Sequence, residues 1–462
     1  MISYAIPMTG NPEIQERSAA GGAGQHQKTS LRRGRMFTKE LCGMNTRKKY
    51  MLAVGLAFGM SLCAAVQPAP FVSFAAAHFM TSAEEHEIGR AAVERFEEKN
   101  DVAMDDDLIT IQQRLIASNP EYLNWNDGLH KRWLAPMKMY HSDQPNAFML
   151  PGGYGYMADS MVNFMDTYQD DGYVSYYRMR PLNGIHIYNT SAVAFVMAHE
   201  FGHWAGKDHL ESYDKQYGLN IISNILGALG GSTSAMTARQ IGINLVDTLW
   251  ERKMSLSQEM GADEWGLQLL ENVPEYSTGG ALIKFNRFLR LEEIRYPDGK
   301  HPKNFRNPHP GTEKRFDRAA EYIKKSSNGR VFVAGGRVYL DGKELIVNGK
   351  ENIVGMERGF YIAGQIAAAI KKDIFHVENI RIVPVNKSPY ARDENVNNLS
   401  YFAVSNRSGT EFKIIDIIAY NPEMSYEDNI RMLFDGKYDV AMAEAICQAM
   451  AEYDKLHPQK RK

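Results

Sequence analysis

The chain carries the stretch His199-Glu200-Phe201-Gly202-His203, directly after the apolar residues 195–198. Because a helix places residues four apart on one face, both imidazoles can reach a single metal ion. Neutral imidazole is a good zinc ligand, and a catalytic zinc site keeps three protein ligands and one open position. Glu200 would lie beside that position, where its carboxylate can take a proton from water and pass it to a leaving amine. The stretch predicts a metal-binding helix; the alternative is a chance spacing on a buried helix.

A second segment, Gln258-Glu259-Met260-Gly261-Ala262-Asp263, offers the missing ligand. Glu259 follows His203 after 55 intervening residues and stands in a helical context. Asp263, one turn later on the same face, can accept a hydrogen bond from a ligand histidine and so fix its tautomer. Taken alone, the two carboxylates would be an ordinary solvated helix face. Beside the histidine pair, they favour a metal site.

Five segments of the chain resemble, in their order, the zinc metallopeptidases that include the CAAX prenyl proteases, HtpX and the periplasmic quality-control proteases. The segments are residues 82–89 (SAEEHEIG), 146–153 (NAFMLPGG), 198–203 (AHEFGH), 258–263 (QEMGAD) and 309–315 (HPGTEKR). Together they cover roughly residues 80–325. The resemblance implies a gluzincin fold in which His199, His203 and Glu259 hold one zinc ion per chain and Glu200 is the general base.

The resemblance also brings His309 and Arg315 to the active site. In the family this histidine stabilises the oxyanion or, in a closed state, occupies the open metal position. His301 is not its equivalent, because no arginine stands six residues beyond it. The other interpretation of His309 is a turn residue in a Pro-rich loop. Asp263 and Arg315 are expected to support the ligands or the oxyanion from behind.

The short alternating run Gly184-Ile185-His186-Ile187-Tyr188 predicts a strand before the metal-binding helix. Zincins bind peptides by pairing them with an edge strand, and this run is the candidate. Residues 158–181 are an insertion relative to the family, which could cover or gate that edge, or form a solvated tyrosine-rich loop. The apolar stretch 217–231 could likewise restrain proteolysis as a plug or form a plain core helix.

The fold class expected is α+β. A mainly helical gluzincin domain with a small edge sheet would span residues 78–325. From residue 326 to residue 462, short β-branched runs are separated by turn signals such as Gly335-Gly336 and Asp341-Gly342. These runs predict a smaller α+β module of unknown role, with helices near 360–372 and 425–456. Docking of substrate or of an envelope partner is the expected use of this module.

The N-terminal residues predict export. Residues 1–43 lack apolar periodicity and are interpreted as a disordered leader or an over-extended reading frame. Residues 44–77 contain a basic start, an uncharged core from Leu52 to Val66 and a small-residue cleavage site near Ala77. The alternative is an uncleaved membrane anchor, although the core is shorter than the ~20 residues that span a bilayer. The expected location is the periplasm or cell envelope, with peripheral membrane association as an option.

The composition argues against nucleic acid as a partner and against a fold held by disulfides. The whole chain has 53 basic and 55 acidic residues, a net charge of −2, which argues against nucleic acid as a partner. Its three cysteines cannot form a disulfide framework. The motifs, together with what the resemblance implies, predict a zinc metalloendopeptidase acting on misfolded or unassembled exported proteins. The competing hypothesis is a catalytically restrained chaperone or assembly factor that holds clients in the zinc cleft.

Overall fold

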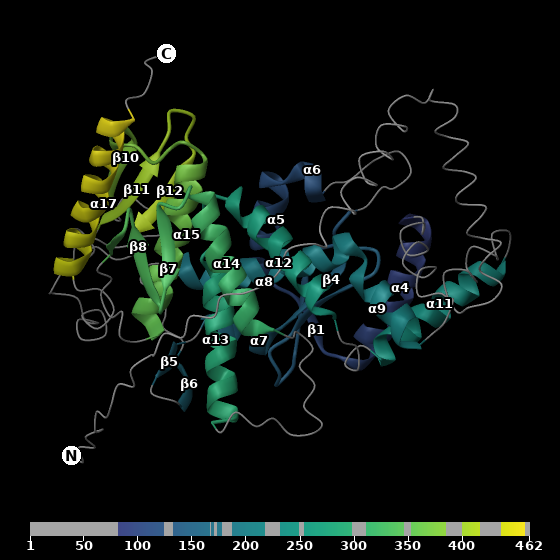
Figure 1. Ribbon diagram of the computed structural model, residues 1–462. Helices are drawn as coiled ribbons and strands as arrows, with labels where there is room; N and C mark the ends of the chain where they lie inside the picture. Colours follow the sequence, from purple (N-terminus) through teal and green to yellow (C-terminus); the bar gives the residue numbers. More distant parts are fainter. Residues whose placement is uncertain are drawn as a thin grey trace, which may run out of the picture. The chain divides into compact units, whose positions relative to one another are not determined.

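The computed structural model describes residues 82–123, 133–166, 168–170, 173–177, 187–217, 232–248, 254–297, 311–345, 353–384, 400–415 and 436–457. All of these lie within one compact unit, Pro70–Lys462. The predicted leader and signal peptide, most of the 217–231 stretch and His309 lie outside the described residues. The expected α+β class is confirmed: helices predominate, and the strands form small separate sheets (Figure 1).

Helix α8 (Ile187–Gly206) lies at the centre of the N-terminal half and carries the two histidines. It packs against α12 (Leu256–Glu271), α13 (Gly280–Arg295) and α7 (Asp159–Asp166). Residues 191–204 of α8 are buried on every side, and apart from Ser191 and the polar residues His199, Glu200 and His203 they are apolar, so the helix has no solvent-facing polar side. Helix α12 begins at a capping box, in which Ser255 and Gln258 satisfy each other's backbone N–H groups.

A four-stranded sheet with the order β1-β2-β4-β3 packs beside α8. Its strands are β1 (Val102–Met104), β2 (Lys138–Tyr140), β3 (Ala147–Leu150) and β4 (Tyr154–Ala158). Strands β3 and β4 form a hairpin, and its turn uses Gly152 and Gly153 at φ values of 78° and 85°. Strand β3 lies at one edge of this sheet and contacts α8.

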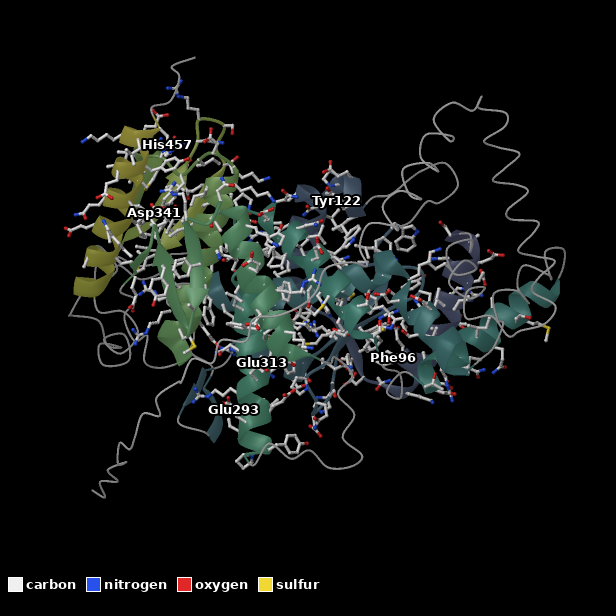
Figure 2. All side chains as sticks on the ribbon, in the orientation of Figure 1. Phe96, Tyr122, Glu293, Glu313, Asp341 and His457 are labelled. Atoms are coloured by element: carbon white, nitrogen blue, oxygen red, sulfur yellow. The ribbon has the colours of Figure 1, made fainter. Side chains whose placement is uncertain are left out.

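The remaining helices of the N-terminal half surround this centre. They are α4 (Ser82–Lys99), α5 (Asp106–Ser118), α6 (Pro120–Leu123), α9 (Asp208–Tyr217) and α11 (Ser232–Asp247). Helix α4 packs along α11 and contacts β3. Phe96 of α4, labelled in Figure 2, meets the rings of Tyr140 and Phe148 edge-on at centroid distances of 5.3 and 5.1 Å. These aromatic contacts fix the sheet against the helices.

The strand predicted at Gly184-Ile185-His186-Ile187-Tyr188 is wrong where the structure describes it. Ile187 and Tyr188 form the first turn of α8, and the other three residues lie outside the described ranges. Five alternating residues are too short to outweigh the adjoining helix, because helix extension adds a hydrogen bond for each residue fixed. The insertion 158–181 instead contains α7 and a two-stranded hairpin, β5 (Tyr168–Asp170) with β6 (Tyr173–Tyr177).

The C-terminal half contains the predicted hairpins and helices. Its elements are α14 (Thr312–Ser326), β7 (Val331–Ala334), β8 (Arg337–Leu340), β9 (Lys343–Glu344), α15 (Ile353–Lys371), η3 (Val377–Asn379), β10 (Ile380–Pro384), β11 (Ser400–Ser405), β12 (Glu411–Ile415) and α17 (Gly436–Leu456). The turns at Gly335-Gly336 and Asp341-Gly342 join β7, β8 and β9 into one antiparallel sheet. Strands β10, β11 and β12 form a second antiparallel sheet.

Helix α15 joins the two halves of the chain. It packs against α13, α14 and α8, and it also contacts β12, β7 and β8. Gly279, at the start of α13, permits the approach, since a Cβ there would lie 1.8 Å from the carbonyl oxygen of Phe360. Arg287 of α13 and Glu357 of α15 form a fully buried ion pair with N–O distances of 2.6 and 2.7 Å. The core is therefore continuous across residue 326. None of the helices described here is long and apolar enough to cross a membrane.

Candidate metal centre

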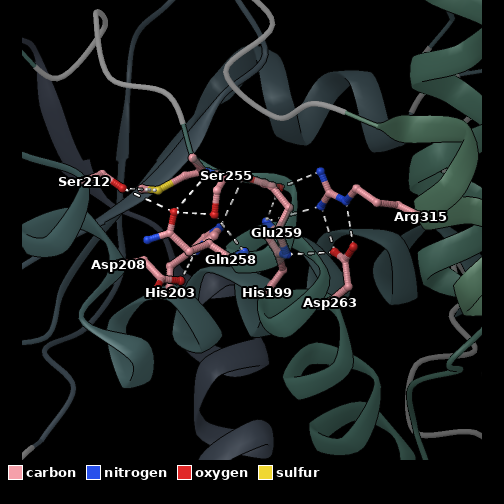
Figure 3. Close-up of polar contacts among 10 residues, drawn as sticks. His199, His203, Asp208, Ser212, Ser255, Gln258, Glu259, Asp263 and Arg315 are labelled. Carbon is pink, nitrogen blue, oxygen red and sulfur yellow. Dashed lines mark hydrogen bonds and ion pairs between the residues drawn. The ribbon is translucent and has the colours of Figure 1, made fainter. Parts of the chain in front are cut away.

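Helices α8 and α12 bring the predicted ligands together. They cross in close contact because glycines face the partner helix. A Cβ on Gly266 of α12 would lie 3.2 Å from the backbone nitrogen of His199, so a larger residue would force the helices apart. This approach brings Glu259 to the face of α8 that carries both histidines (Figure 3).

His199, His203 and Glu259 form a compact, fully buried donor set. One ligand atom from each lies within 4.8 Å of the others. The Nε2 atom of His199 is 3.5 Å from Oε2 of Glu259, and the Nε2 atom of His203 is 3.6 Å from Oε1. Two imidazole nitrogens and a carboxylate oxygen that converge in this way fit a single divalent cation. The structure therefore brings together the three residues predicted as ligands.

Each ligand histidine has a carboxylate at its other ring nitrogen. Asp263 places Oδ1 2.9 Å from Nδ1 of His199, as predicted from the helical spacing. Asp208 places Oδ2 2.7 Å from Nδ1 of His203. Sequence reasoning missed Asp208, and its only local signal is that it follows the helix-ending pair Gly206-Lys207. With Nδ1 occupied, both rings present Nε2 to the metal position.

Arg315 lies in the same cluster, as the resemblance implied. It comes from α14 and is 2% exposed. Its Nε and Nη2 atoms donate to the two oxygens of Asp263 at 2.6 and 2.7 Å, and Nη1 lies 2.6 Å from Oε2 of Glu259. The guanidinium thus holds two carboxylates of α12 at once. One of these is a predicted ligand and the other supports His199.

Burial and neighbouring charges shift the pKa values of the two histidines in opposite directions. Burial lowers the pKa of His199 well below its ordinary value, and the positive charge of Lys284 adds to this effect. Burial also acts to lower the pKa of His203, but hydrogen bonds to Asp208 and Glu259 outweigh it and raise that pKa to about 10. The carboxylates around His203 thus favour positive charge at this position, which a bound cation would supply.

Lys284 of α13 is a second cation that sequence reasoning missed. Its side chain is buried, and its Nζ atom lies over the rings of Phe195 and Phe285 at 5.3 and 5.4 Å. Burial, together with the positive charge of Arg315, lowers the pKa of Lys284 to about 8. The signal in the sequence was one lysine inside the apolar start of a helix, 280–285.

Glu200 follows the first ligand on α8 and is 2% exposed. Its negative charge contributes to the raised pKa values of His203 and Arg315, so its carboxylate lies in the same cluster. Of the four carboxylates in this cluster, Glu200, Glu259 and Asp263 interact with the cations Lys284 and Arg315, and Asp208 contacts His203. Two negative charges are left over. A divalent cation bound by neutral histidines would balance them.

Comparison with known proteins agrees with this geometry. Residues 128–323 match the sequence model of peptidase family M48. A search of curated proteins finds no match. The matched range contains α8, α12 and the Arg315 end of α14, and hence every described residue of the cluster. The expected resemblance is confirmed: residues 128–323 form an M48 peptidase domain with a gluzincin ligand set, and the chain is a metallopeptidase.

Proposed function

We propose that the chain is a zinc-dependent metalloendopeptidase that hydrolyses misfolded or unassembled exported proteins in the bacterial cell envelope. The observation that carries the zinc assignment is the convergence of one ligand atom each from His199, His203 and Glu259 within 4.8 Å, with both Nε2 atoms facing Glu259. Two imidazoles with one carboxylate are typical of catalytic zinc sites, which keep a fourth position open for chemistry. One zinc ion per chain is the expected content.

The residues around the metal position would carry the proton transfers. When bound, zinc supplies a Lewis acid that polarises a carbonyl and lowers the pKa of a water molecule toward ~7. The carboxylate of Glu200 would accept a proton from the attacking water and donate it to the leaving amine. Because Glu200 is almost fully buried, its charge acts in a medium where electrostatic interactions are strong.

Strand β3 is the proposed platform for an extended substrate. It is at the edge of the four-stranded sheet, contacts α8 and pairs with β4 alone among the described strands. An extended peptide that pairs with β3 would run beside the helix that carries Glu200. This role moves from the predicted run 184–188 to residues 147–150, and it supports cleavage within a chain rather than at its ends.

The envelope location and the client class rest on the sequence. Residues 44–77 have the pattern of a signal peptide, and export would give access to unfolded or unassembled envelope proteins. The C-terminal elements from β7 onward are the proposed docking region for an envelope partner, with peripheral membrane association. Because α15 packs into the core of the peptidase half, a partner bound there would be held close to the metal centre.

Glu200→Gln tests the proposal. The purified wild type and variant should each hold one zinc ion, and casein cleavage should fall by about 10²–10⁴-fold in the variant. Glu264→Gln is the matched control, since Glu264 lies on α12 and pairs with Arg318 on the exposed surface. Retained cleavage in Glu200→Gln would overturn the assignment. Bound zinc with no cleavage in wild type would favour the restrained holding factor instead.

A further inference from the structure

The turn between α8 and α9 has an unusual backbone. Lys207 adopts a positive φ of 55°, and its N–H donates to Trp204 while its carbonyl accepts from Leu210, both at 3.1 Å. A left-handed conformation at a residue with a side chain is strained. The turn separates the end of α8 from the start of α9, and the first residue of α9, Asp208, lies against His203.

Gly206 leaves the space that the Asp208 carboxylate fills. A Cβ on Gly206 would lie 2.9 Å from Oδ1 and 3.2 Å from Cγ of Asp208. An alanine at position 206 would displace this carboxylate, because the end of the Asp208 side chain can move more easily than the backbone. Gly206 and the left-handed Lys207 thus both influence where the Asp208 carboxylate lies.

The turn between α8 and α9 is also held by contacts with α4. Lys207 Nζ lies 3.8 Å from Oε2 of Glu85 on α4, and both side chains are buried. The other oxygen of Glu85 accepts from the N–H of Gly152 in the β3–β4 turn at 3.2 Å. A buried cation held by a buried carboxylate keeps Lys207 in its strained conformation. The position of Asp208 therefore depends on the α8–α9 turn itself, on Glu85 of α4 and, through Glu85, on the β3–β4 turn.

We propose that Asp208 is a positioning residue for the metal: it fixes the tautomer and ring orientation of His203. A neutral imidazole carries one N–H, and an acceptor 2.7 Å from Nδ1 places it there. The lone pair of Nε2 is then free to bind the cation. Asp208 does for His203 what Asp263 does for His199 from the opposite side of the site. This inference rests on the proposed zinc function.

The test is zinc affinity by chelator competition, together with the visible absorption spectrum of the cobalt-substituted protein. Asp208→Asn removes the charge, and its amide can turn to donate to Nδ1, which would move the imidazole proton to Nε2. Gly206→Ala keeps Asp208 but displaces its carboxylate. Both variants should bind zinc about 10–100-fold more weakly and show an altered cobalt spectrum. Gly261→Ala, whose added Cβ meets nothing within 4 Å, should match wild type in both measurements.

Wild-type zinc affinity and an unchanged cobalt spectrum in either variant would overturn the proposal. Far-UV circular dichroism of the metal-free proteins shows whether each variant folds, and Gly206→Ala decides the matter alone if Asp208→Asn does not. If wild type itself binds no zinc, the proposed function fails rather than the role of Asp208.

Discussion

Gly202 of α8 and Ala262 of α12 are in direct backbone contact. A Cβ built on Gly202 would lie 2.7 Å from the Cα atom and 2.9 Å from the carbonyl oxygen of Ala262. Backbone atoms cannot move aside as the end of a side chain can. Because each residue directly precedes a member of the metal cluster, His203 and Asp263, this contact sets how closely the two ligand helices approach.

Gly202→Ala should therefore weaken metal binding and destabilise the fold. The added methyl must push α12 away from α8, and overpacking of this kind costs about 1–3 kcal/mol. Zinc content after dialysis and urea denaturation measure the two effects. Gly261→Ala is the control, because it adds the same methyl to α12 in open space. Wild-type zinc content and stability in Gly202→Ala would show that the spacing tolerates change.

Removal of the metal should lower the thermal stability of wild type reversibly. The four carboxylates of the cluster outnumber its two side-chain cations, so chelation leaves a buried charge imbalance. Free zinc at 100 times its Kd would stabilise the fold by about 2.7 kcal/mol. Differential scanning calorimetry with and without a chelator measures this difference. A His203→Ala variant should lose most of the response, and an equal Tm in chelated and zinc-loaded wild type would contradict the prediction.

Arg287 and Glu357 should be strongly coupled in stability. Removing one partner of a fully buried ion pair leaves the other charge uncompensated, and this costs about 3–5 kcal/mol. Arg287→Met and Glu357→Leu should each show this loss, whereas the double variant should lose much less than the sum of the two. Urea denaturation of all four proteins completes the cycle. The exposed pair Arg318 and Glu264 is the control, with an expected coupling below about 1 kcal/mol. Additive losses at Arg287 and Glu357 would argue against coupling.

The attachment of α17 should weaken as the pH rises. His376 Nδ1 lies 2.6 Å from Asp454 of α17, and Nε2 lies 3.0 Å from Asp373. Burial acts to lower the pKa of His376, but the hydrogen bonds to Asp454 and Asp373 outweigh it and raise that pKa above its ordinary value. A raised pKa means that the contribution is complete below about pH 6.5, the ordinary value, and is lost as pH rises through the raised one.

Hydrogen–deuterium exchange in α17, corrected for the intrinsic rate, should accordingly increase toward alkaline pH. His376→Gln should remove this pH dependence, because a glutamine does not titrate. His141→Gln is the matched control, since His141 pairs with Asp159 on an exposed surface far along the chain from α17. Equal pH profiles for wild type and His376→Gln would count against a role of His376 in the attachment of α17.

Local spacing alone was enough to find the centre of the site. The four-residue interval between His199 and His203 requires a shared helix face, and the same interval places Glu259 and Asp263 together. The C-terminal turns at Gly335 and Asp341 were equally predictable, because glycine and aspartate adopt the positive φ values that those turns use. In each case the determining interaction lies within a few residues of chain.

Other features depended on contacts between distant segments. The run ending at Tyr188 alternates like a strand, but the buried helix that follows it extends back through Ile187. A lysine such as Lys284 is expected at the surface from the sequence, but in the structure its Nζ atom lies over the rings of Phe195 and Phe285.

The sequence by itself determined the donor set of the candidate metal centre, which is two histidines and a glutamate on helices, and it pointed to Glu200 as the proposed general base. The tertiary structure decided which side chains support it. Asp208 contacts His203 directly after the left-handed turn at Lys207, and Glu85 on α4, more than a hundred residues earlier, pairs with that lysine. Helical periodicity is a local property written in the order of residues. A carboxylate that arrives through a strained turn is placed by packing, and packing exists only once the chain has folded.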